Sequence, residues 1–278
     1  MLPPLPTEIL TGKAGQEILA AAAALRTAHP EAEAVAFWDF DGTLFEGDCS
    51  EGFLSGDGTR IAGLAESAVL AGWSQQYPAE GGFDRFWQDY HALMGREGQA
   101  AAYVSLVRAF AGAPEAALHE MAALEFNGRL RPWFFQEALN LWQELEAGGV
   151  RCMVISASPD FFIKGAAETL GVPMDRLHGL RLGTGADGTL LDEPLEPLTI
   201  GTGKARMLRR LLAGRETGVA HAIAAFGNDF INDGPMLEAV AEARLPGGRP
   251  LAALVNQRLP ATGAGPLREI TFAPRFSS

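Results

Sequence analysis

Two acidic residues stand where a short apolar run ends, in the segment Asp39-Phe40-Asp41-Gly42-Thr43. Side chains alternate between the two faces of a strand, so Asp39 and Asp41 could project the same way, and Gly42 permits a tight turn after them. Two carboxylates this close repel each other, and the pKa of one rises unless a cation lies between them. Mg²⁺ is the obvious cation, because it is hard and prefers oxygen ligands.

Hydroxyl and lysine side chains occupy comparable places further along the chain. Ser156 ends a second apolar run, VRCMVIS at 150–156, and Ser158 follows just beyond it. A hydroxyl at a strand end can hold a phosphoryl oxygen, although such a serine often satisfies backbone groups instead. Gly201-Thr202-Gly203-Lys204 falls at an expected helix start, where the glycines, the helix N-terminus and the lysine charge favour an anion.

A second pair of carboxylates follows a third apolar run, 219–226. Asp229 and Asp233 are four residues apart within GNDFINDGPML. The chain thus supplies a pair of acids, a hydroxyl, a lysine and another pair of acids, in that order. Phosphoryl transfer to a carboxylate needs a nucleophile, an acid–base group, a metal cage and a positive clamp, and this set could provide all four.

Apolar runs alternate with helical periods over most of the chain, which predicts a parallel sheet covered on both faces. In such a sheet ligands bind outside the carboxyl ends of the strands, where the residues above are expected to lie. The expected strands cover 34–39, 150–156, 219–226 and 251–257, with an edge strand at 268–272 and a hairpin around Asp187-Gly188. The expected helices of this part cover 13–28, 132–147, 159–170 and 202–213.

A long segment after the first acidic pair has a different character, because strand-like runs are scarce and helical periods dominate. Helices are expected there at 59–71, 83–94, 98–111 and 114–125, between Gly and Pro breaks. We therefore expect an α/β, doubly wound core with an inserted all-helical cap. The predicted parts are an N-terminal helix and first strand at 1–46, the cap at 47–131 and the rest of the core at 132–278.

Taken together in this order, Asp39-Phe40-Asp41-Gly42-Thr43, Ser156, Lys204 and Asp229 to Asp233 resemble the four motifs of the haloacid dehalogenase superfamily of phosphohydrolases. The resemblance spans roughly residues 34–245, and the helical insertion is similar to the cap of the phosphoserine-phosphatase-like branch. The acidic, Trp-rich cap is also loosely similar to that of bacterial phosphocholine phosphatases. The resemblance implies a Rossmann-type core, a Mg²⁺ cofactor and a small phosphomonoester as substrate.

Catalytic roles follow from the resemblance residue by residue. It implies that Asp39 attacks phosphorus and becomes a phospho-aspartate. Asp41 would protonate the leaving oxygen and then deprotonate the hydrolytic water. Ser156 and Lys204 would bind the transferring phosphoryl group.

The resemblance also implies a metal site. Mg²⁺ would be held by Asp39, the main-chain carbonyl of Asp41 and Asp229, and Asp233 would orient these groups. The fourth motif of the family usually has Gly directly before its first Asp, and in this chain Asn228 stands there.

Thr43, Asp48 and Ser158 are the expected substrate-binding residues. In phosphoserine phosphatases an acid at the place of Asp48 contacts the substrate amine, and Glu46 and Glu51 lie beside it in this sequence. The resemblance therefore points to amine-bearing esters such as phosphoserine, phosphocholine or phosphoethanolamine. A solvated acidic loop would explain the same three acids.

Aromatic residues of the expected cap allow two interpretations. Phe83, Phe86, Trp87 and Tyr90 follow the i, i+3, i+4, i+7 spacing of an ordinary core stripe. Alternatively, one or two of them form a wall for a cationic head group.

Composition limits the classes of partner. The chain has 278 residues, 47% of them hydrophobic, and a formal net charge of −12. This acidity disfavours nucleic acid and anionic membranes, so we expect a small phosphorylated metabolite and no nucleic-acid or membrane partner. Two cysteines without metal-ligand spacing and an N-terminus without signal-peptide features favour a cytoplasmic protein.

Several rival functions share part of this residue set. A dehalogenase of the superfamily needs no Mg²⁺ and lacks the second Asp, so Asp41 argues against it. A signalling receiver domain carries no long helical insertion. A phosphomutase would keep every residue named above, and a non-catalytic phospho-ligand-binding protein stays open as well.

Overall fold

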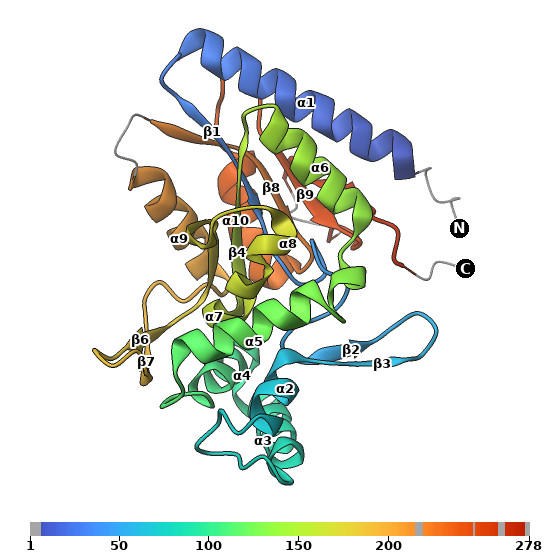
Figure 1. Ribbon diagram of the computed structural model, residues 1–278. Coiled ribbons are helices and arrows are strands. Elements are labelled where there is room, and N and C mark those ends of the chain that lie inside the picture. Colours follow the sequence, from blue (N-terminus) through green and yellow to red (C-terminus); the bar gives the residue numbers. More distant parts are fainter. Residues whose placement is uncertain (1–6, 215–218, 247, 261–264, 276–278) are drawn as a thin grey trace. The chain divides into compact units, whose positions relative to one another are not determined.

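The computed structural model describes residues 7–214, 219–246, 248–260 and 265–275, which form two compact units (Figure 1). The first unit comprises Met1–Glu46, Phe134–Ile155 and Gly201–Ser278, and the second comprises Gly47–Trp133 and Ser156–Ile200. The domain boundaries expected from the sequence remain a prediction, and the compact units group 156–200 with 47–133.

The first unit contains most of a central sheet and its covering helices. Its strands are β1 (Glu33–Trp38), β4 (Arg151–Pro159, which continues into the second unit), β8 (Ala220–Gly227), β9 (Leu251–Val255) and β10 (Arg268–Ile270). Its helices are α1 (Thr7–Ala28), α6 (Gln136–Ala147), α9 (Thr202–Ala213) and α10 (Phe230–Ala241). The helix expected at 13–28 thus begins earlier, at Thr7.

The six-stranded sheet has the order β10-β9-β8-β1-β4-β5, with β10 at an edge as the sequence predicts. Strand β1 pairs in parallel with both β4 and β8, so that Trp38 lies opposite Val154 on one side and Phe226 on the other. Parallel strands need long crossovers, and helices provide them here. The predicted α/β, doubly wound fold class is confirmed.

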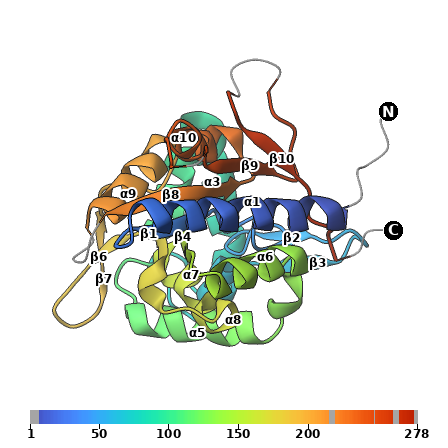
Figure 2. The same cartoon turned by 90° about the horizontal axis from the view of Figure 1, so that it is seen from above.

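Helices cover both faces of the strands of the first unit. Figure 2 shows α9 and α10 together on one face of these strands and α1 with α6 on the other. Strands buried on both faces read as continuous apolar runs. The core between the strands and α10 includes Val35, Phe37, Ile155, Met236 and Leu254, all of them buried.

The second unit is mainly helical. Its larger helices are α2 (Leu64–Leu70), α3 (Gly82–Glu97), α4 (Gln99–Arg108) and α5 (Glu115–Asn127). Its shorter helices are η1 (Arg131–Trp133), α7 (Asp160–Ile163), η2 (Lys164–Ala166), α8 (Ala167–Leu170) and η3 (Met174–Arg176). Its strands are β2 (Gly52–Leu54), β3 (Arg60–Ala62), β5 (Leu177–Leu180), β6 (Leu182–Thr184) and β7 (Leu190–Pro194).

The insertion after the first motif differs from the all-helical expectation. Strands β2 and β3 pair as an antiparallel hairpin where the helix at 59–71 was expected to begin, and only α2 is helical in that range. The turn between them is closed by Ser55 N–H, which donates to the carbonyl of Thr59, and by Asp57, whose carboxylate accepts from Thr59 N–H. Asp57-Gly58 is thus a turn signal of the kind that marks hairpins.

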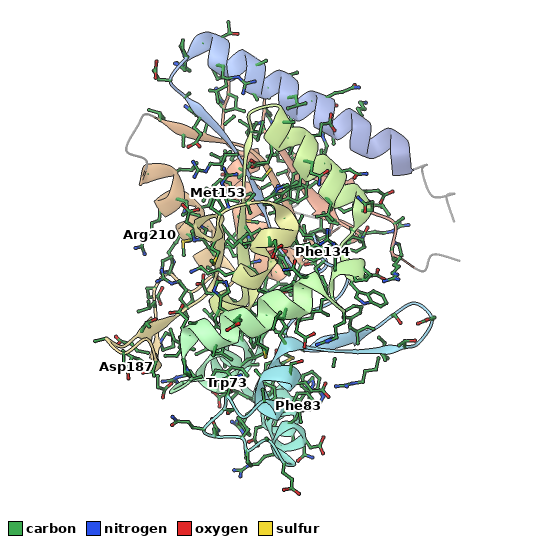
Figure 3. All side chains as sticks on the ribbon, in the orientation of Figure 1. Trp73, Phe83, Phe134, Met153, Asp187 and Arg210 are labelled. Carbon is green, nitrogen blue, oxygen red and sulfur yellow. The ribbon has the colours of Figure 1, made fainter. Side chains whose placement is uncertain are left out.

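One expected helix of this unit is interrupted, and the expected hairpin is present. The helix expected at 159–170 is broken into α7, η2 and α8. The expected hairpin is confirmed, since β6 and β7 pair antiparallel and Figure 3 places Asp187 at their turn. In the part of the chain that the structure describes, no helix combines the length and hydrophobicity that crossing a membrane requires.

Candidate active site

The loop after β1 is held rigidly by the aromatic side chain between its two acids. Phe40 is buried, stacks on Phe45 with ring centroids 6.0 Å apart and meets Phe134 edge-on at 5.8 Å. The Phe40 carbonyl accepts backbone N–H bonds from the next turn, including one of 2.9 Å from Leu44. Asp39 N–H donates to the carbonyl of Phe226 at 2.8 Å, so the first acid starts where β1 still pairs with β8.

Gly42 brings this loop against the loop after β8. Its φ is +68°, and a Cβ atom there would lie 1.9 Å from Nδ2 of Asn228. A side chain at position 42 would therefore be strained and would also collide with Asn228. Asp41 and Asp229 are the neighbours of these two residues, so the Asn228 side chain packs on Gly42 where the two acid-bearing loops meet.

Lys204 lies between two carboxylates of the first unit. Its Nζ is 2.6 Å from Asp39 Oδ1 and 2.5 Å from Asp233 Oδ1, and the lysine side chain is 2% exposed. Lys204 occupies the first turn of α9, directly after Gly201-Thr202-Gly203. The expected helix start at 202 is confirmed, and it places the lysine at the carboxyl ends of β1 and β8.

Burial and neighbouring charges set the protonation of Asp39 and Lys204. Burial, and after it the charge of Asp233, raise the pKa of Asp39 to about 7, although Lys204 opposes both effects. Burial alone would lower the pKa of Lys204, but the charges of Asp233 and Asp39 raise it above its ordinary value. The lysine therefore stays protonated as a fixed cation, and Asp39 is a carboxylate whose charge is incompletely compensated.

Asp233 holds the loop of the fourth motif. Its Oδ2 accepts the backbone N–H groups of Asn228 at 2.8 Å and Asp229 at 2.9 Å. The helix α10 approaches so closely that a Cβ on Gly227 would lie 2.5 Å from the Cβ of Asp233. Both oxygens of Asp233 are thus engaged with protein groups, which suits a residue that orients the loop.

Asp229 is the N-cap of α10. Its Oδ1 accepts from Ile231 N–H at 2.8 Å, and its Oδ2 accepts from the side-chain amide of Asn232 at 2.9 Å. An ionised carboxylate has about four acceptor positions, so these bonds leave lone pairs for a further partner.

The donor set at these strand ends fits Mg²⁺. Burial raises the pKa of Asp39, so a further cation beside it would stabilise its ionised form. The Gly42–Asn228 contact joins the loops of Asp41 and Asp229. Within the described ranges, no three His, Cys, Asp or Glu side chains cluster closely enough to enclose a metal. Mg²⁺ does not require three such side chains, because it keeps several waters as ligands and is usually held by one or two carboxylates and phosphate oxygens.

Thr43 and Ser156 belong to different units. Thr43 is buried in the first unit, and its Oγ1 lies 3.4 Å from Asp39 Oδ2. Ser156 lies on the part of β4 that belongs to the second unit, where its Oγ accepts the N–H of Ser158 at 3.0 Å. The Ser158 hydroxyl in turn accepts a hydrogen bond of 3.1 Å from Ser50.

Asp48 and Glu51 form an acidic pair in the second unit. Asp48 Oδ1 accepts the N–H groups of Ser50 at 2.8 Å and Glu51 at 2.7 Å. Burial raises the pKa of Asp48. Burial and the charge of Asp48 raise the pKa of Glu51 to about 7, although a hydrogen bond from the Tyr90 hydroxyl lowers it. Glu46 lies in the other unit, where its carboxylate accepts the N–H of Arg275.

The aromatic stripe of α3 is partly a core stripe, as one of the two interpretations expects. Phe86 and Tyr90 are buried, as a core stripe predicts, while Phe83 and Trp87 are half-buried and stack on each other with centroids 6.0 Å apart. Figure 3 labels Phe83 on this helix. The Tyr90 hydroxyl adds a polar function to the core face, because it reaches Glu51.

A comparison with models of protein families explains why these residues occur in this order. The model of haloacid dehalogenase-like hydrolases matches residues 36–238. The chain belongs to this family. The segment matched contains all four motifs, from Asp39 to Asp233, and the predicted recognition and the expectation of an enzyme of the hydrolase class are confirmed.

Solved structures of haloacid dehalogenase-like and other proteins share the fold. A protein of unknown function from Bordetella pertussis Tohama I is 19% identical, with TM-score 0.59, over 86% of this chain and 98% of that one. A HAD-family hydrolase from Salmonella enterica serovar Typhi is 17% identical, with TM-score 0.53, and the match covers 98% of this chain and 81% of that one. A probable phosphoserine phosphatase from Vibrio cholerae is 16% identical, with TM-score 0.53, and the match covers 87% of this chain and 61% of that one. No curated protein matches the chain.

Three contacts of this hydrolase were not anticipated from its sequence. They are the packing of Asn228 on Gly42, the hydrogen bond from Tyr90 to Glu51 and the bond from Ser50 to Ser158. The departure from the usual Gly before Asp229 was the available signal for the first. The other two join residues far apart in sequence, and no local pattern indicates them.

Proposed function

We propose that this hydrolase is a Mg²⁺-dependent phosphatase that cleaves a small phosphomonoester through a phospho-aspartate on Asp39. The observation that carries the proposal is the buried Asp39 carboxylate, bonded to Lys204 at the carboxyl end of β1. A buried carboxylate beside a fixed cation is suited to attack an anionic phosphoryl group, because the cation offsets the repulsion between them.

The proposed reaction has two steps. One Asp39 oxygen forms a bond to phosphorus while the ester P–O bond breaks, and Asp41 gives its proton to the departing alkoxide. Water then attacks the phosphorus of the phospho-aspartate, Asp41 takes a proton from that water, and the Asp39 carboxylate and inorganic phosphate are released. Lys204 and Ser156 are proposed to bind phosphoryl oxygens.

The proposed metal ligands are Asp39, the main-chain carbonyl of Asp41 and Asp229, with Asp233 holding the loop that carries Asp229. A bound Mg²⁺ supplies positive charge that offsets the charge of the phosphoryl oxygens and of Asp39. The bonds from the N–H groups of Asn228 and Asp229 to Asp233 support its orienting role.

The acidic pair in the second unit supports an amine-bearing substrate. Asp48 Oδ1 is engaged by two backbone N–H groups, and no ion pair of Asp48 or Glu51 with Lys or Arg occurs among the described residues of that unit. Two half-buried acids without a cation are stabilised by binding one. Phosphoserine, phosphocholine and phosphoethanolamine all carry such a cation, and we propose a metabolite of this class as the substrate.

Asp48→Asn tests the amine contact. The amide keeps the shape and the acceptor for the two N–H groups but removes the charge. We expect KM for phosphocholine to rise about tenfold, as for a lost charge-assisted contact, while KM for glycerol phosphate stays within about twofold. Steady-state phosphate release from the two esters measures this. An equal rise for both would remove Asp48 from amine recognition.

The acidic pair also predicts a pH dependence of substrate preference. Because the pKa of Glu51 is raised to about 7, Glu51 is mostly neutral at pH 6 and ionised at pH 8. The ratio of kcat/KM for phosphocholine to that for glycerol phosphate should therefore rise between pH 6 and pH 8. The choline charge does not titrate, and effects on the shared phosphate cancel in the ratio.

Variants of the same pair control this pH experiment. Glu51→Gln should make the ratio of the two kcat/KM values independent of pH. Tyr90→Phe removes a hydrogen bond that lowers the pKa of Glu51, so the midpoint should move to higher pH. A ratio that is independent of pH in the unaltered enzyme would rule out Glu51 as a partner of the ammonium group.

The proposed activity itself is tested by phosphate release from a panel of phosphomonoesters, with Mg²⁺ and with a chelator. Release that requires Mg²⁺ supports the proposal. A phosphomutase would release little phosphate and would respond to a bisphosphate, and a binding protein would bind the esters without turnover. Either result would overturn the proposed phosphatase.

A further inference from the structure

A buried chain of serines runs through the second unit. Ser50 Oγ donates to Ser158 Oγ at 3.1 Å, and Ser158 N–H donates to Ser156 Oγ at 3.0 Å. All three residues are buried, Ser156 to 1% exposure and Ser50 to 2%. Ser50 is 108 positions from Ser158 in sequence, so this bond ties the loop after the first motif to the end of β4.

The direction of these bonds decides what Ser156 can do. A hydroxyl has one donor hydrogen and two acceptor lone pairs. Because Ser156 Oγ accepts from Ser158 N–H, its own hydrogen is directed away from that bond and is available to an oxygen of a ligand. The position of Ser158 therefore restricts the directions in which Ser156 can donate.

The other end of the chain of serines is joined to the acidic pair. Ser50 N–H donates to Asp48 Oδ1 at 2.8 Å, next to the bond from Glu51 N–H to the same oxygen. Ser50 thus binds Asp48 through its backbone and Ser158 through its side chain. Removing a buried hydrogen-bond partner leaves the other group unsatisfied, which makes such a bond an effective positional constraint.

We propose that Ser50 is a positioning residue that sets the distance between the amine-binding acid Asp48 and the phosphate-binding hydroxyl of Ser156. It thereby selects phosphate esters by the number of atoms between phosphate and ammonium. The inference rests on the proposed function, because it takes Ser156 as a phosphate donor and Asp48 as an amine contact. Ser50 itself touches neither group of the substrate.

The test compares Ser50→Ala with the unaltered enzyme on esters of different length. The substrates are phosphoethanolamine and 3-aminopropyl phosphate, which differ by one methylene, with glycerol phosphate as the neutral reference. We expect Ser50→Ala to reduce the preference between the two amine esters about fivefold, by loss of one buried hydrogen bond. Ser50→Thr keeps the hydroxyl and should restore the preference.

A matched control separates positioning from general destabilisation. Ser74 is also buried in the second unit, where its Oγ donates to the carbonyl of Ala109 at 2.6 Å and accepts from Tyr77 N–H. Ser74→Ala should lower the melting temperature by a similar amount and leave the length preference unchanged. If Ser74→Ala and Ser50→Ala reduce the preference equally, or if neither does, the positioning role is wrong.

Binding of inorganic phosphate distinguishes failure of this inference from failure of the proposed function. Calorimetry with inorganic phosphate and Mg²⁺ needs no turnover. Weaker phosphate binding by about fivefold in Ser50→Ala, restored in Ser50→Thr, would support the role of Ser50 even if no ester were hydrolysed. Unchanged phosphate affinity in Ser50→Ala would overturn it even in an active phosphatase.

Discussion

Asp39→Asn should lose about three orders of magnitude or more in kcat/KM for every ester in the panel, with phosphate release close to background. An amide oxygen is a poor nucleophile, and the phospho-aspartate cannot form on it. The substitution is nearly isosteric, so the amide oxygen still accepts from Lys204, and the fold should persist. Phosphate release at saturating and at low ester concentration measures the effect.

Two controls make the Asp39 result decisive. The melting temperature and the affinity for inorganic phosphate should stay close to those of the unaltered enzyme, since the bond to Lys204 remains. Fresh protein is needed, because deamidation of the introduced asparagine would regenerate the acid and restore activity slowly. An Asp39→Asn enzyme that is folded, homogeneous and still active would mean that another residue is the nucleophile.

Lys204→Met should lower the free energy of unfolding by about 3–5 kcal/mol and also abolish turnover. Lys204 Nζ lies between Asp39 and Asp233, all three side chains being buried. Methionine fills the space but leaves two buried carboxylates without a cation, which is the costly way to break a buried pair. Chemical denaturation with chelator present measures the stability.

The pH dependence of this loss has a definite sign. Lys204 lowers the pKa of Asp39, so its removal raises that pKa beyond about 7. A carboxyl group whose pKa is higher in the folded than in the unfolded state destabilises the fold when it is ionised. The loss of unfolding free energy caused by Lys204→Met should therefore be largest at high pH and should shrink as the pH falls towards about 7, where Asp39 of the unaltered enzyme is itself half protonated.

Lys164 offers the matched control for Lys204. It pairs with the buried Asp160 at 2.6 Å, but its side chain is 26% exposed, and it lies in the second unit. Lys164→Met should cost clearly less stability, because water reaches this pair and screens its charges. If Lys204→Met were as stable as Lys164→Met at pH 8, the buried trio would not carry the charge described above.

Sequence reasoning located the central trio because of a general property of parallel sheets. Asp39 follows β1, and Asp233 lies in the first turn of α10 just after β8; these strands are neighbours, so their carboxyl ends meet. The helix start at 202 placed Lys204 in the same region. These inferences required only apolar runs, turn residues and the order of the elements.

The contacts that sequence reasoning missed are side-chain contacts between distant segments. Asn228 replaces the usual Gly of the family, yet its packing on Gly42 depends on the meeting of two loops. Tyr90 had the spacing of a core residue, and its hydroxyl contact with Glu51 does not alter that periodicity. The β2–β3 hairpin was missed because its strands are three residues long, too short for an alternating pattern to show.

The central claim is that the phosphoryl group passes through Asp39, and trapping the phospho-enzyme tests it most directly. In Asp41→Asn the group that deprotonates the hydrolytic water is absent, so a covalent phospho-enzyme should accumulate when a reactive aryl phosphate and Mg²⁺ are added. After an acid quench and peptide mapping by mass spectrometry, we predict one phosphoryl group on Asp39, labile to hydroxylamine. A phosphoryl group on any other residue, or substrate turnover with no covalent phosphate at all, would contradict the account.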